Sequence, residues 1–524
     1  MPAPTPRRIV VLALLPAWTA IAGGTTRAVG HTTPDLEGHL WTIWHATRGS
    51  LTRAHLLSWP DGVDLLPILG GWADIVLASM VAPLVGVPLA YNLTMAFYLL
   101  VAGVGGLAMA RALRLDWPAA ILCGVLLQLD PTTLQHLWAG RSEQVGVGIL
   151  ALFLAAGLTT TQHPGKQWPV AVALTGALSL AVAWEYALFV AAFGAWMVAI
   201  APDHKARLRL VGGGAGAVLL AGPAVWALAT HSTAGGGGRF ATEWALRAAQ
   251  NAVVPAVPHS WMAARPATLP LLCLLALPWT ARALGRRFTI GLATGLLLAL
   301  VLSLGPEPTL LHRPPTGTPA SWAPFTWLAS LPGLTRYQTP ARLLAPWTLA
   351  APVAAALALH HIQRHRVLLA GLVLVVSLVE VAGVLPQARH TPTDWSAMQV
   401  LADDPHPGGV YDLPAQRRGG RTIDYQQAQM VHTRGILHHS LQPYLSREAA
   451  PDDPFLAWTR GTASAADALT SLRARSFGFV VLHNVRERGF DVGLQRQRLS
   501  DLLGPPAHTG PGWWAWQVTR EATP

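Results

Sequence analysis

Charged residues are scarce in this chain of 524 residues: Asp, Glu, Lys and Arg make up only 12%, whereas hydrophobic residues make up 52%. A water-soluble fold of this length needs much more surface charge. The mean hydropathy of +0.37 and long apolar blocks such as residues 90–110 and 290–304 instead predict a polytopic membrane protein.

Cysteine is almost absent, and no internal repeat is visible. The two cysteines, Cys123 and Cys273, both lie inside apolar blocks. They cannot form a Cys-x-x-Cys metal or redox motif, so we expect them to be packing residues. The missing repeat, together with charges that gather at the ends of the apolar blocks, argues against a transporter built from paired halves.

The net charge of +11 comes from short basic clusters between the apolar blocks. Such clusters are typical of cytoplasmic loops, so they orient the chain in a membrane and do not predict a nucleic-acid partner. Arg7 and Arg8 precede the first apolar run, which we interpret as a retained helix with a cytoplasmic N-terminus. About eleven spans follow from this alternation, at residues 9–24, 89–110, 118–129, 145–158, 169–184, 186–200, 210–230, 269–284, 288–304, 343–360 and 367–385.

The last part of the chain has a different composition. Residues 409–413, 477–483 and 513–518 are predicted strands, and residues 395–402, 463–475 and 494–503 are predicted helices. We therefore expect a transmembrane domain at 1–386, with interfacial helices in a first outer loop at 25–88, and a small α/β domain at 387–524. An odd number of spans places this second domain outside the cytoplasm.

Two carboxylates follow the first apolar run, in the segment Asp35-Leu-Glu37. Either side chain could be a base that activates a hydroxyl, and the pair could hold a divalent cation such as Mg²⁺ or Mn²⁺. The alternative is an ordinary helix start, with Thr33 as N-cap and Pro34 at the first helical position.

Further polar residues stand near the predicted outer face. Arg141 could bind a phosphate and Glu143 could add a carboxylate to the site, or the two could form a surface ion pair. Glu185 could line the same chamber, or it could be solvent-exposed. Arg336 and Arg342 precede a late span, where they could reach a lipid phosphate or act as interfacial anchors.

These features together resemble the GT-C superfamily of integral membrane glycosyltransferases. Asp35-Leu-Glu37 is similar to its acidic motif, and the segment 59–67 is similar to its proline-bearing stretch before an interfacial helix. Bacterial YfhO-like membrane proteins are a nearer resemblance, through the segments 91–92, 331–333, 336, 340–342, 410–414 and 479–483.

The resemblance implies transfer of a sugar from a polyprenyl-phosphate carrier to a glycan, lipid or protein acceptor at the outer face of a bacterial cytoplasmic membrane. It implies that Asp35 is the general base and that Glu37 and Glu143 assist it or hold a metal. The remaining implied contacts to the substrate are His39, Arg141, Glu185, Arg336 and Arg342. A non-catalytic membrane scaffold and a lipid or polysaccharide transporter are the alternatives.

Overall fold

The computed structural model describes residues 10–65, 71–232, 285–303, 324–330, 343, 345–362, 364–415, 422–438, 453–487 and 489–518. Its contacts divide the chain into two compact units. The first unit contains Met1–His31 and Gly70–His390, and the second contains Thr32–Leu69 and Thr391–Pro524.

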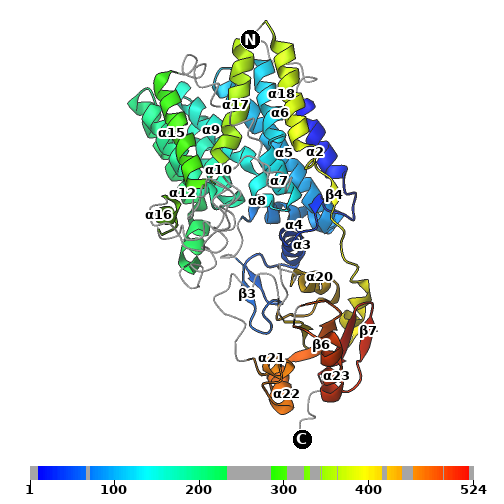
Figure 1. Cartoon of the computed structure of the whole chain (residues 1–524). Helices are drawn as coiled ribbons and strands as arrows, with labels where there is room; N and C mark the ends of the chain where they lie inside the picture. Colours follow the sequence, from blue (N-terminus) through cyan, green and yellow to red (C-terminus); the bar gives the residue numbers. More distant parts are fainter. Residues whose placement is uncertain are drawn as a thin grey trace. The chain divides into compact units, whose positions relative to one another are not determined.

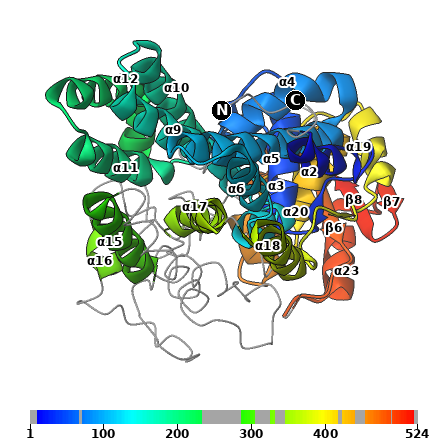
Figure 2. The ribbon, with the colours of Figure 1, turned by 90° about the horizontal axis from the view of Figure 1, so that it is seen from above.

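The first unit is a bundle of helices, drawn in blue through yellow-green in Figure 1 and seen along its helices in Figure 2. A two-residue parallel pair, β1 (Gly30–His31) with β4 (Ala388–Arg389), joins segments far apart in the sequence. The helices are α2 (Val11–Ile21), α4 (Ala73–Val85), α5 (Val87–Ala112), α6 (Trp117–Gln128), α7 (Pro131–Trp138), α8 (Ser142–Val145), α9 (Val147–Gln162), α10 (Gln167–Val182), α11 (Tyr186–Ile200), α12 (His204–Ser232), α15 (Arg286–Ser303), α16 (Pro324–Ser330), α17 (Ala345–His361) and α18 (Arg366–Val381).

Helices stand at ten of the eleven predicted spans, and the predicted span 269–284 lies outside the described residues. Among the described helices, two are long and apolar enough to cross a membrane, Val87–Ala112 and Ser142–Gln162. Shorter apolar helices include Val11–Ile21, Ala73–Val85, Gln167–Val182, Tyr186–Ile200 and Phe288–Ala299. The helix positions are confirmed, whereas the number of spans stays a prediction.

Glycines allow α5 and α9 to pack with their backbones in contact. A Cβ atom added at Gly148 of α9 would lie 2.3 Å from the backbone nitrogen of Ala102 in α5, and one added at Gly105 would lie 2.5 Å from the carbonyl oxygen of Gly148. Close helix approach through small residues is typical of helices in membranes.

We expect Gly148→Ala to destabilise the bundle by about 1–3 kcal/mol, because the added methyl group meets backbone atoms that cannot rotate away. Thermal unfolding of the purified protein in detergent measures the effect. Gly194→Ala is the matched control, since a Cβ atom at Gly194 of α11 would meet nothing within 4 Å. Equal melting temperatures for the two variants would contradict this account of the packing.

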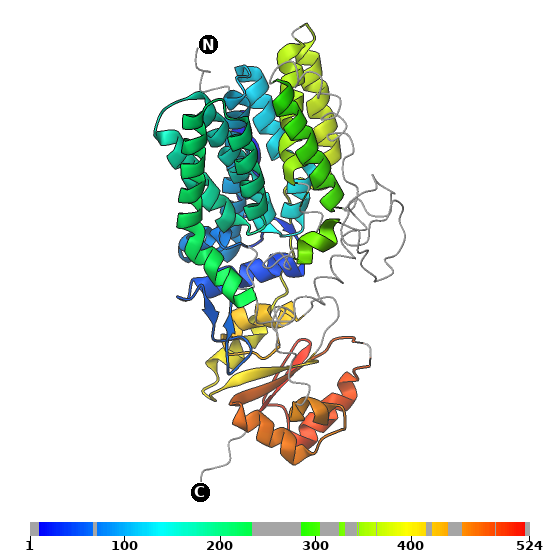
Figure 3. The ribbon, with the colours of Figure 1, turned by 90° about the vertical axis from the view of Figure 1, so that its left-hand side faces the viewer.

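The second unit contains a four-stranded sheet in the order β5-β6-β8-β7, shown in yellow to red in Figure 3. β5 (Gly409–Leu413) and β6 (Phe477–His483) are parallel, whereas β8 (Trp513–Gln517) is antiparallel to both β6 and β7 (His508–Gly510). The predicted strands 409–413 and 477–483 agree residue for residue with β5 and β6. The helices are α3 (Pro34–Ala46), the 3-10 turn η2 (Ser396–Met398), α19 (Gln399–Asp403), α20 (Ile423–His432), α21 (Pro454–Thr459), α22 (Ala465–Ala474) and α23 (Val492–Leu503).

The segment after α3 belongs to this second unit, although it lies more than 300 residues before the sheet. Leu57 lies in the connection between the paired strands β2 (Arg53–Ala54) and β3 (Val63–Asp64), and it forms a parallel bridge with Ile436. Ile436 in turn bridges to Val410 of β5, so the sheet edge continues into the early segment. The expected transmembrane domain 1–386 included residues 25–88, but the contacts place Thr32–Leu69 with the C-terminal residues.

Trp59 also holds the early segment against the sheet edge. Its indole nitrogen donates a hydrogen bond to the carbonyl oxygen of Ser476 (3.1 Å). The ring lies where Cβ atoms at Gly409 and Gly435 would be, at 2.5 and 2.2 Å from ring carbons. Both glycines therefore make room for the indole.

Candidate functional site

Helix α3 carries the first pair of predicted site residues. The hydroxyl of Thr33 accepts a hydrogen bond from the backbone nitrogen of Leu36 (3.1 Å), and Pro34 occupies the first turn. Asp35 and Glu37 follow in that same turn, where the helix dipole favours negative charge. The helix start expected from the sequence is confirmed.

The two acids have different surroundings. Residues two positions apart on a helix point about 200° away from each other. Asp35 is exposed, whereas Glu37 is only 6% exposed. Burial, followed by the charge of Asp424, raises the pKa of the Glu37 carboxyl to about 7. Asp35 is therefore the more accessible of the two carboxyls, and Glu37 is harder to ionise than an ordinary glutamate.

Helix α20 packs against α3 within the second unit. The side chain of Gln427 donates a hydrogen bond to the carbonyl oxygen of Glu37 (2.8 Å), and the indole of Trp41 donates to Gln429 (2.9 Å). Trp41 also stacks on His45, with ring centroids 5.1 Å apart and planes 4° apart. Burial lowers the pKa of His45. His39 is half-buried between these residues on α3.

A second group of polar side chains is buried inside the first unit. Ser142 at the start of α8 donates a hydrogen bond to Asp74 in the first turn of α4. Gln144 of α8 donates to Glu185, just before α11, over 2.9 Å. Glu143 lies between these two α8 residues and is 7% exposed.

The two predicted acids of this unit, Glu143 and Glu185, are both buried. Glu185 is 3% exposed, so its solvent-exposed alternative is wrong, and the burial of Glu143 is not that of a surface ion pair. Tyr98 of α5 is fully buried and interacts electrostatically with Asp74 and Glu143. Asp74 and Tyr98 were not among the predicted site residues, although a carboxylate in the first turn of an apolar helix is a signal that could have found Asp74.

Of the three predicted arginines, the structure describes only Arg141. Arg141 is half-buried at the N-cap of α8, and its backbone nitrogen donates to the carbonyl oxygen of His136 (2.9 Å). Arg336 and Arg342 lie outside the described residues.

The predicted metal role of Asp35, Glu37 and Glu143 finds no support in the part of the chain that the structure describes. That part contains no group of three or more His, Cys, Asp or Glu side chains able to hold a metal ion. Asp35 and Glu37 point to different sides of α3, and their metal role stays a prediction.

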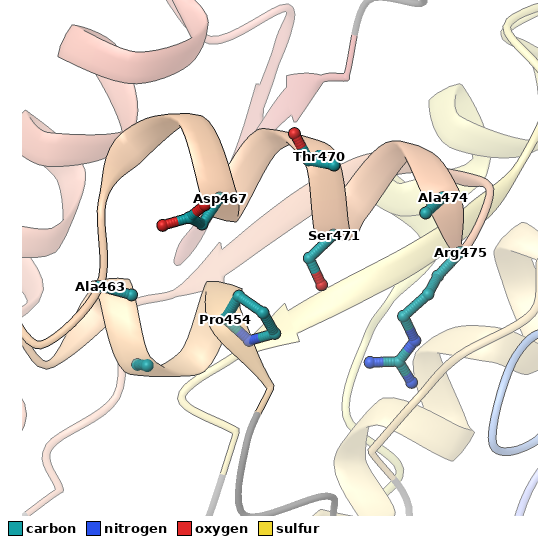
Figure 4. Close-up of a pocket in the computed structure, with 8 residues that line it drawn as sticks. Pro454, Ala463, Asp467, Thr470, Ser471, Ala474 and Arg475 are labelled. Carbon is teal, nitrogen blue, oxygen red and sulfur yellow. The ribbon is translucent and has the colours of Figure 1, made fainter.

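A groove of about 530 Å³ lies between α21 and α22 of the second unit (Figure 4). Arg475 at one end forms an ion pair with Asp453 (3.2 Å). The predicted site residues do not line this groove; its lining is Pro454, Ala457, Ala463, Asp467, Thr470, Ser471, Ala474 and Arg475.

Comparison with solved structures finds a similar fold in an oligosaccharyltransferase and an arabinofuranosyltransferase. The oligosaccharyltransferase AglB from Archaeoglobus fulgidus, solved with an inhibitory peptide and a dolichol-phosphate, has a TM-score of 0.55 at 11% identity, covering 91% of this chain and 69% of AglB. The arabinofuranosyltransferase AftD from Mycobacteria has a TM-score of 0.58 at 15% identity, covering 99% of this chain and 40% of AftD. No family model matches the sequence. No curated protein matches it either.

Proposed function

We propose that this protein is a membrane glycosyltransferase that moves a sugar from a polyprenyl-phosphate donor to an acceptor at the outer face of a bacterial cytoplasmic membrane. The observation that carries the proposal is the exposed Asp35 in the first turn of α3, directly after the first apolar helix of a chain with the GT-C fold. The same fold serves an oligosaccharyltransferase and an arabinofuranosyltransferase, so sugar transfer is the activity that the fold supports best.

The proposed reaction is a single displacement at the anomeric carbon of the sugar. Asp35 takes the proton from the acceptor hydroxyl, whose oxygen forms the new bond to that carbon. The bond from the carbon to the phosphate oxygen breaks, and its electron pair leaves with the polyprenyl phosphate. Arginine side chains stabilise such a leaving phosphate through charge-assisted hydrogen bonds, and we assign this role to Arg342 together with Arg141 or Arg336.

The buried acids have a supporting role in this proposal. Glu143 and Glu185 lie in the polar region of the bundle around α8, where side chains that bind a sugar hydroxyl would be shielded from water. His39 is placed one turn from Asp35 on α3, within reach of the same substrate. The YfhO-like relationship stays a prediction. Because the described residues do not fit a metal cage, we derive no step through a metal ion.

The test is a transfer assay with the purified full-length chain in lipid nanodiscs. A radiolabelled polyprenyl-phosphate sugar is supplied with extracts of cell-envelope acceptors, and the acceptor fraction is separated from lipid. Label that moves into the acceptor only when the protein is present supports the proposal. Sugar-lipid that crosses proteoliposome membranes without any covalent product would instead identify a transporter. No transfer and no flux, with an unchanged glycan profile in a deletion strain, would favour the scaffold.

A further inference from the structure

Basic side chains gather at one end of the helical bundle, where α5 and α17 end and α6 and α18 begin. Helix α6 contacts each of the other three (Figure 1). Among the described residues 105–118, 356–362 and 364–368, Asp116 is the only acid. An anion therefore meets a positive field at this end. The basic residues here include Arg111, Arg114, His360, His361, Arg364 and Arg366.

Asp116 binds basic groups from two different helices. The guanidinium of Arg366, at the start of α18, donates a hydrogen bond to its carboxylate. Nδ1 of His360, near the end of α17, lies 3.6 Å from the other carboxylate oxygen. Asp116 also caps α6, because its side chain accepts a hydrogen bond from the backbone nitrogen of Ala119 (3.2 Å). One acid thus fixes the ends of three helices, and the other arginines keep this end positive.

Arg364 differs from Arg366 in its surroundings. The side chain of Arg366 is 25% exposed and is directed toward α6 by its contact with Asp116. Arg364 is exposed, in the turn between α17 and α18. His361 at the end of α17 is exposed as well, and its ring packs edge-on against that of His360, with centroids 5.2 Å apart. The exposed side chains of this turn can therefore reach a ligand without breaking the contacts of Asp116.

An apolar stripe on α18 begins next to these basic residues. Leu368, Leu372, Val375 and Val379 follow one another at intervals of four, three and four positions, so they share one face of the helix. Each of them is 57–72% exposed. The stripe extends over about 17 Å of helix. A positive end beside an exposed apolar stripe matches the two parts of a phospholipid, a charged headgroup and an acyl chain.

We propose that this end of the bundle binds an anionic phospholipid. Arg364, with the exposed basic side chains of the same turn, holds the headgroup phosphate, and the apolar stripe of α18 holds an acyl chain. A zwitterionic lipid carries its own cation beside the phosphate, which weakens the attraction to arginine. A soluble phosphate would contact the arginine but not the stripe. The inference goes beyond sugar transfer and does not depend on it.

Native mass spectrometry of the full-length protein in detergent, titrated with phosphatidylglycerol, tests the site. We expect phosphatidylglycerol to bind more tightly than phosphatidylcholine. Arg364→Gln should weaken the binding of phosphatidylglycerol about fivefold, and Arg364→Lys, which keeps the charge, should retain most of it. Arg207→Gln is the matched control, because it removes an exposed arginine near the start of α12 and should bind the lipid as the wild type does.

Two further measurements separate the lipid site from its alternatives. Glycerol phosphate, which has the phosphate but no acyl chain, should not displace the lipid. Without lipid, Arg364→Gln should keep the wild-type melting temperature because Arg364 is exposed, and added phosphatidylglycerol should raise that temperature more in the wild type than in the variant.

Three results would each overturn the inference: equal affinity for the two lipids, an equal loss in Arg364→Gln and Arg207→Gln, or displacement of the lipid by glycerol phosphate. The second of these would show that the basic surface attracts lipid without a defined site. None of the measurements uses the transfer reaction, so a failure here leaves the proposed function untouched.

Discussion

Asp35→Asn is expected to lower the rate of sugar transfer by about 10²–10⁴-fold, the usual contribution of a general base. The amide cannot accept the hydroxyl proton at neutral pH, but it keeps the size and the hydrogen-bonding ability of the carboxyl. Because Asp35 is exposed in the first turn of α3, the change leaves no cavity and no buried polar group. The measurement is kcat/KM in the nanodisc assay, with KM for the donor determined separately.

The matched control is Asp61→Asn. Asp61 is also an exposed acid of the second unit, in the turn between β2 and β3, and it lies outside α3. We expect it to retain the wild-type rate, and both variants to keep the wild-type melting temperature. If Asp35→Asn transfers sugar as fast as Asp61→Asn does, Asp35 is only a residue of a helix start and the proposed mechanism is wrong.

Arg434→Met is expected to lower the free energy of unfolding of the second unit by about 3 kcal/mol or more. Its guanidinium donates to the carbonyl oxygens of four residues that precede β5, namely Leu401 (2.5 Å), Asp404 (2.6 Å), His406 (2.6 Å) and Gly408 (3.2 Å). Hydrogen bonds to a charged group contribute about 1.5–3 kcal/mol each, and the carbonyls would lose them together. Methionine keeps most of the apolar volume, so the change reports on the polar contacts.

Hydrogen exchange of the β5 backbone in the full-length protein measures this loss locally. Arg434→Lys keeps the charge but cannot reach four carbonyls with one ammonium group, so we expect it to recover only part of the protection. Arg460→Met removes an exposed arginine of the same unit and should leave β5 exchange unchanged. Wild-type protection of β5 in Arg434→Met would show that the loop before the strand is held by other contacts.

Local pattern was enough to predict most helices and strands. The apolar run 186–200 agrees with α11 at both ends, and the alternating or buried runs 409–413 and 477–483 agree with β5 and β6. Elements with weaker apolar patterns were missed. Helix α20 has a polar inner surface, so its sequence lacks the apolar stripe by which an amphipathic helix is recognised.

The sequence identified single residues of the candidate site, but it did not predict their burial or their neighbours in space. The sequence identified Asp35 and Glu37 as a pair, but it gave no sign that one is exposed and the other is 6% exposed. It also offered no reason to connect Glu37 with Asp424, which is 387 residues later and belongs to a helix that was not predicted. Glu185 was predicted to line the same chamber as Glu143; both acids are buried, and the shared chamber stays a prediction.

By itself, the sequence determined where most of the apolar helices and the strands β5 and β6 form. Their apolar periods of 3.6 and 2 residues can be read from neighbouring positions in the chain. Tertiary structure alone decided that Thr32–Leu69 packs with the C-terminal residues and that α3 lies against α20. It also decided that Glu37 of the motif is buried and has a raised pKa. Those outcomes depend on desolvation and charge from residues hundreds of positions away, which no local pattern contains.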